Sequence, residues 1–141
     1  MQFLDRLKST VGIGAPTIAI EGVPRTAHAG DVLRGAVVLV GGDHDVPLKD
    51  LALHLDEQRL VHTVPTAAAD PERQSLRAIV GVQIALGGRT LASGERLQWA
   101  FELGLPPDLE PSAGQLCYAL IAETGVPGVD PTVELPVLIV A

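Results

Sequence analysis

Two carboxylates and an imidazole follow one another in the segment GGDHDVP, residues 41–47. Asp43, His44 and Asp45 are residue types that divalent metal ions accept as ligands. Successive residues of a strand cannot all reach one ion, although a loop could bring two of them together. No spaced His or Cys motif accompanies them, so the sequence favours a solvated turn and predicts no metal site.

A second histidine and carboxylate, His54 and Asp56, are two residues apart. This spacing places both side chains on the same face of a strand, close enough to hydrogen-bond. A catalytic dyad would need a nucleophile beside them, and the alternating pattern instead predicts that this face is exposed. We therefore expect an ordinary surface pair.

Cys117 is the only cysteine of the chain, which rules out an intrachain disulfide and is compatible with a reducing compartment. Its neighbours Leu116 and Tyr118 lie in an apolar run without a nearby base, a setting in which a thiol usually behaves as a small hydrophobe. The segment GIGAP, residues 12–16, lacks the lysine of a phosphate-binding loop and reads as a helix stop. We predict no catalytic residue, no cofactor-binding residue and no cofactor.

The composition predicts one domain with an aliphatic core. The chain has 141 residues, of which 47% are hydrophobic but only 3% aromatic. It carries 10 basic and 17 acidic residues, a net charge of -7, and every Lys and Arg lies at or before Arg96. Because nucleic-acid affinity comes largely from basic contacts to phosphates, nucleic acid is excluded as a partner.

A short amphipathic helix is expected at the N-terminus, in residues 1–14. Phe3, Leu4, Leu7 and Val11 fall on one face at helical spacing, and the glycines that follow end the helix. Packing on the rest of the protein is favoured over contact with a membrane surface. The chain has no signal-peptide pattern and no apolar run of membrane-spanning length, so a cytoplasmic protein without stable membrane insertion is predicted.

The sequence of the remainder, residues 15–141, predicts one all-β domain. Short β-branched or alternating runs are separated by Gly, Pro and Asp clusters, which predicts an antiparallel β-sandwich. The expected strands are residues 17–23, 32–40, 48–59, 76–86, 90–91, 96–105, 115–123 and 133–140, with a further edge strand in which 59–61 meets 62–64.

Alternation identifies the inward side chains of two of these strands. Those expected to face the core are Leu51, Leu53 and Leu55 in one strand and Leu97, Trp99, Phe101 and Leu103 in another. Residues 36–40 and 135–140 do not alternate, so both faces of the sheet are apolar there. The predicted helix or a second subunit would have to cover the outer face.

The last strand is the predicted site of protein binding. Pro136 has no N–H to donate to a neighbouring strand, which places residues 133–140 at a sheet edge or bulge. An apolar edge invites pairing with another strand, either from a partner protein or from a second copy in a homo-oligomer. The residues predicted to form this edge are Val133, Leu135, Val137 and Ile139.

The segment LPPDLEP, residues 105–111, joins two of the predicted strands. Pro106, Pro107 and Pro111 fix their own φ angles and restrict the residues before them. Such a corner is stiff, which favours a rigid connector over an active-site loop.

The order of these features resembles the bacterial sporulation-control family known as stage-zero sporulation protein M, which is similar in turn to the N-terminal half of arrestins. The matching segments are LKSTVGIGAP (7–16), AGDVLRGAVVLVGG (29–42), VPLKDLALHL (46–55), GERLQWAFELGLPPDLEP (94–111) and VDPTVELPVLIV (129–140). The resemblance implies an arrestin-like, immunoglobulin-like sandwich and a regulatory role in sporulation, envelope or stress physiology.

The leading functional hypothesis is a non-catalytic protein-interaction or scaffold domain. The alternative from a different class is a small metal-dependent hydrolase that would use His44, His54 or His62 with nearby carboxylates. A third hypothesis is a sandwich that binds a small ligand such as a sugar, for which one Trp and one Tyr offer little stacking surface.

Overall fold

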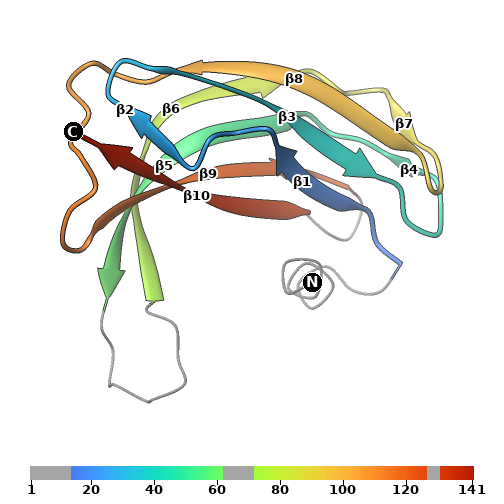
Figure 1. The fold of residues 1–141 in the computed structure, drawn as a ribbon. Coiled ribbons are helices and arrows are strands. Elements are labelled where there is room, and N and C mark those ends of the chain that lie inside the picture. Colours follow the sequence, from blue (N-terminus) through green and yellow to red (C-terminus); the bar gives the residue numbers. More distant parts are fainter. Residues whose placement is uncertain (1–13, 62–71, 127–130) are drawn as a thin grey trace.

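The computed structural model describes residues 14–61, 72–126 and 131–141 (Figure 1). These ranges contain strands and turns, and no helix in them could cross a membrane. The predicted N-terminal helix lies outside them, and of the predicted helix-and-hinge segment, residues 1–14, only Gly14 is described. The strands are β1 (Thr17–Glu21), β2 (Thr26–His28), β3 (Val32–Val40), β4 (Val46–Pro47), β5 (Leu51–Val61), β6 (Glu72–Ile84), β7 (Thr90–Leu91), β8 (Arg96–Gly104), β9 (Leu116–Thr124) and β10 (Thr132–Val140).

All eight predicted strands are present, with ends shifted by a few residues. The proposed extra edge strand is not separate over its described part, because residues 59–61 form the end of β5 and residues 62–64 lie outside the described ranges. Sequence analysis missed β2 and β4. They have three and two residues, too few to show alternation.

The strands form two facing layers. One sheet has the order β1-β3-β8 and the other β2-β10-β9-β5-β6, while β4 and β7 pair with each other. Figure 1 shows β3 and β8 lying over β5, β9 and β10. The buried side chains of both sheets form one hydrophobic cluster between the layers.

One strand pair corrects the prediction of purely antiparallel sheets. β2 runs parallel to β10, with Leu138, Ile139 and Val140 opposite Thr26, Ala27 and His28. The reason is the bend at residues 22–25. The chain leaves β1 there, aided by the positive φ of 78° at Gly22, and continues as β2 in the other sheet.

The inward side chains follow the predicted alternation. Leu51, Leu53 and Leu55 are at most 1% exposed, and the inward residues of β8 are buried or half-buried. Leu33, Val37 and Leu39 of β3, which lies next to β8 in the three-stranded sheet, belong to the same hydrophobic cluster. Each such side chain contributes about 1.5 to 3 kcal/mol when it is fully buried, so these strands form the stable centre of the fold.

The outer face of β3 is also apolar, as predicted. Val38 is 4% exposed although its side chain points away from the core. Arg96 of β8 forms an ion pair with Glu21 of β1 at 3.3 Å. In register, Arg96 lies opposite Val40 and Glu21 opposite Ala36, so this ion pair crosses β3 over Val38 and helps to cover it.

The proline-rich corner between β8 and β9 is anchored by hydrogen bonds at several points. The Tyr118 hydroxyl donates to the carbonyl of Glu110 at 2.7 Å, and the Leu105 N–H donates to the carbonyl of Asp31 at 2.8 Å. Farther along, Ser112 exchanges hydrogen bonds with Ile139 of β10. These contacts fix the corner to β9, to Asp31 before β3 and to β10, as expected of a rigid connector.

Candidate functional site

The Asp43, His44 and Asp45 segment forms the turn that follows β3. Asp45 accepts a hydrogen bond from the backbone N–H of Ser93 at 2.8 Å, and the N–H of Asp43 donates to the carbonyl of Gly14 at 2.8 Å. His44 is exposed. The Asp45 carboxylate therefore already holds two turns together.

In the described part of the chain, the residues of the hydrolase alternative do not form a metal site. Within residues 14–61, 72–126 and 131–141, no three His, Cys, Asp or Glu side chains are placed to hold a metal ion. His44 lies in the turn after β3, and His54 lies in the middle of β5. His62 lies outside the described residues.

His54 and Asp56 do share the outer face of the five-stranded sheet, but the prediction that this pair is exposed was wrong for Asp56. This carboxylate is only 2% exposed. It accepts hydrogen bonds from the amide of Gln58 at 3.1 Å and from the hydroxyl of Ser75 at 2.9 Å. His54 Nε2 lies 3.9 Å from its Oδ1 atom. Asp56 is thus a buried acceptor at the centre of a polar cluster.

The pairing of β5 with β6 explains this burial. The register shifts between Leu55 and Asp56 and again between Glu57 and Gln58, while the pairing of β5 with β9 runs without a break. The extra residues are therefore in β6, and they bring Ser75 opposite Gln58. The cluster is not fully paired, because Oε1 of Gln58 is buried without a hydrogen-bond donor among the described residues.

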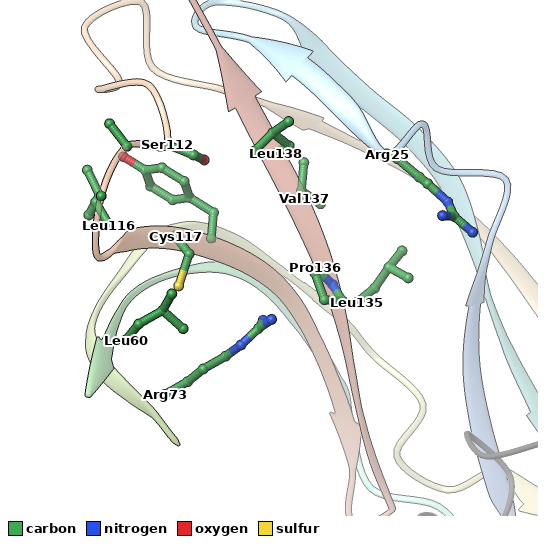
Figure 2. A pocket seen from close by; sticks show the side chains of 13 residues that line it. Arg25, Leu60, Arg73, Ser112, Leu116, Cys117, Leu135, Pro136, Val137 and Leu138 are labelled. Atoms are coloured by element: carbon green, nitrogen blue, oxygen red, sulfur yellow. The ribbon is translucent and has the colours of Figure 1, made fainter. Parts of the chain in front are cut away.

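A groove of about 640 Å³ lies on the same outer face, at the end of the sheet nearest the β5–β6 hairpin. We call it the outer groove. Leu60, Cys117, Pro136 and Leu138 contribute apolar surface from three adjacent strands, and Arg25 and Arg73 lie at its two sides. Figure 2 shows Leu60, Cys117 and Arg73 on one side of β10 and Arg25 on the other.

Cys117 is half-buried in this groove, and its thiol donates a weak hydrogen bond to the carbonyl of Gln58 at 3.6 Å. Burial raises the pKa of the Cys117 thiol, and the nearby Arg73 guanidinium opposes the rise only in part. The thiol is therefore less reactive than a free cysteine at neutral pH.

Alkylation of Cys117 is expected to require a higher pH in the native protein than in the urea-unfolded protein. The unfolded thiol loses its proton near the usual value of about 8.5, whereas the native thiol keeps it longer. Stability is consequently unaffected below that pH and decreases above it, because the unfolded state binds fewer protons there. Iodoacetamide rates between pH 7 and 10 test this, and a native inflection at or below the unfolded one would contradict it.

The predicted edge strand, β10, is covered only in part on the side away from β9. β10 is flanked by β9 along Thr132–Val137 and by β2 at its end. Val133, Val137 and Ile139 are 1% to 3% exposed and Leu135 is half-buried. These side chains form part of the core, so the exposed side chains of β10 are the outward ones of Glu134, Pro136 and Leu138.

The opposite edge of this sheet is β6. It pairs only with β5 among the described strands, and ten of its 13 residues are exposed. Its first half contains both register shifts, but the stretch from Val80 to Ile84 pairs regularly with Leu51–Leu55. This second half is a continuous, mostly apolar strand with one side unpaired.

The protein-family comparison shows to which family the chain belongs. The family model described as SpoOM protein matches residues 4–123, most of the chain. The chain belongs to this sporulation-control family. A comparison with curated protein sequences gave no match.

A solved structure supports this family assignment at the level of the fold. The sporulation control protein Spo0M from Bacillus subtilis is similar with a TM-score of 0.75 and 20% sequence identity. The alignment covers 92% of this chain but 51% of the B. subtilis protein. This family member thus spans about half the length of that relative.

Proposed function

We propose that this chain is a non-catalytic protein-interaction domain that serves as a regulatory scaffold of the sporulation-control family in the cytoplasm. We also propose that its two-layer fold is arrestin-like. Function is a property of sites and not of folds, so the proposal rests on one surface. That surface is the unpaired edge of β6.

The regular half of β6 has what strand addition requires. Its backbone N–H and C=O groups on the side away from β5 have no partner strand among the described residues, and such groups bind an extended segment in register. Val82 is 38% exposed beside this edge and can contact an apolar side chain of the added strand. A partner protein or a second copy of this chain could supply that strand.

The first half of β6 is protected against strand addition. Register shifts in β6 interrupt the regular pairing there, and Arg73 and Arg77 place charges along it. Bulges and charges are the usual means by which edge strands avoid unwanted pairing. Binding is therefore expected to be confined to residues 80–84.

Replacing Val82 by lysine is expected to abolish capture of the partner while the domain stays folded. A lysine at an edge strand opposes strand addition, and Val82 is exposed enough for an ammonium group to reach water. Capture from a cytoplasmic extract, followed by mass spectrometry, measures the effect. The expected loss is about tenfold or more in the amount of partner recovered.

Val32→Lys is the matched control. Val32 is 43% exposed and lies on β3 in the other sheet. A protein retained by the native chain and by Val32→Lys, but lost by Val82→Lys, supports the proposal. Equal recovery with all three proteins, each shown by thermal denaturation to be folded, would refute strand addition at β6.

A further inference from the structure

The outer groove combines apolar surface with two cationic side chains. Leu138 is 50% exposed, more than any other large hydrophobic side chain that is described. Pro136, next to it on the same face, is exposed as well. Apolar surface of this kind beside a hollow is typical of binding sites.

Arg25 and Arg73 give the groove its charge. Both side chains are exposed, and neither forms an ion pair or a side-chain hydrogen bond with the described residues. Figure 2 shows the guanidinium of Arg73 directed toward β10. No acidic side chain lines the groove in the described part of the chain, although the protein has 17 acidic and only 10 basic residues. The groove is thus locally positive on an acidic protein.

The backbone fixes the positions of the two arginines. The N–H of Leu138 donates to the carbonyl of Arg25 at 2.8 Å, which holds Arg25 beside β10. Arg73 lies opposite Leu60 at the start of β6. Arg25 lies one strand position beyond β10, so four strand spacings of about 4.8 Å, about 19 Å of sheet, separate it from Arg73. This span equals about six residues of extended chain.

We propose that the outer groove binds an extended acidic segment of a partner protein. Carboxylates about six residues apart would contact Arg25 and Arg73, and apolar side chains between them would cover Leu138 and Pro136. A guanidinium pairs well with a carboxylate, which accepts two parallel hydrogen bonds. A fatty acid has the same two chemical features but a single carboxylate, so it would leave one arginine unused. This site is separate from the β6 edge.

The test uses a fluorescein-labelled peptide, Glu-Leu-Ala-Leu-Ala-Leu-Glu, and its counterpart with Gln at both ends. Anisotropy titrations of the native protein are expected to show saturable binding of the acidic peptide and about tenfold weaker binding of the neutral one. Arg25→Gln and Arg73→Gln should each weaken binding by about twofold to fivefold, the range for exposed ion pairs. Arg34→Gln, which removes an exposed arginine of the other sheet, should change nothing.

Cys117 supplies a second readout because it lies in the groove and is the only thiol of the chain. Bound peptide is expected to slow its alkylation in the native protein but not in the double arginine variant. The proposal is overturned by equal binding of both peptides, by no saturable binding at millimolar concentration, or by protection of Cys117 by dodecanoate but not by the peptide. Val82→Lys should bind the peptide normally, which separates this result from failure at the β6 edge.

Discussion

A lysine in place of Val137 is expected to prevent the domain from folding, whereas a lysine in place of its neighbour Leu138 should leave it folded. Val137 is 2% exposed and Leu138 is 50% exposed. An unpaired buried ammonium costs several kcal/mol, which is comparable to the 5–15 kcal/mol of a typical domain. Circular dichroism and urea denaturation of the two variants measure the difference.

Val137→Ala keeps this comparison quantitative if the lysine variant cannot be purified. It should fold and lose about 2 kcal/mol, the scale of a truncated core side chain. Similar stability of Val137→Lys and Leu138→Lys would mean that β10 does not alternate as described. In that case Val133, Leu135, Val137 and Ile139 would again be candidates for direct contact with a partner protein.

Asp56→Ala should lower the free energy of unfolding by about 2 to 4 kcal/mol. The substitution removes the acceptor of the hydrogen bonds from Gln58 and Ser75. It leaves the buried amide of Gln58 without this partner, whereas Ser75 is exposed and can bond to water. Asp56→Asn is expected to recover part of the loss, because an amide retains one acceptor oxygen. Urea denaturation of both variants gives the two values.

Asp108→Ala is the control for Asp56, because Asp108 is exposed in the proline-rich corner. It should change the free energy of unfolding by no more than about 0.5 kcal/mol. Equal effects of the two alanine substitutions would show that the outer-face cluster contributes nothing beyond a surface carboxylate.

The parts of the fold that were predictable are those set by local pattern. Alternating leucines identified the inward face of β5, and the order of turn glycines and prolines identified the family. The burial of Asp56 was not predictable because it depends on register shifts in β6, a strand that begins 16 residues after Asp56. Bulges of that kind have no signal in β5 itself.

The end of the predicted edge was hidden for a similar reason. In the described part of the chain, residues 133–137 of β10 have no partner strand on the side away from β9, but β2 covers residues 138–140, and its three residues were too few to be recognised as a strand. The outer groove was also invisible in the sequence. Its residues come from four strands and a bend, and only the topology brings Arg25, Arg73 and Leu138 to one face.

Amide hydrogen exchange along β6 tests the central claim most directly. In dilute 15N-labelled protein, residues 80–84 are predicted to show slow exchange at amides that bond to β5 and fast exchange at amides that face the open edge. The central strands β5 and β9 should be protected at successive residues, because each is paired on both sides. Slow exchange at every amide of residues 80–84 would mean that the edge is already covered and would contradict strand addition there.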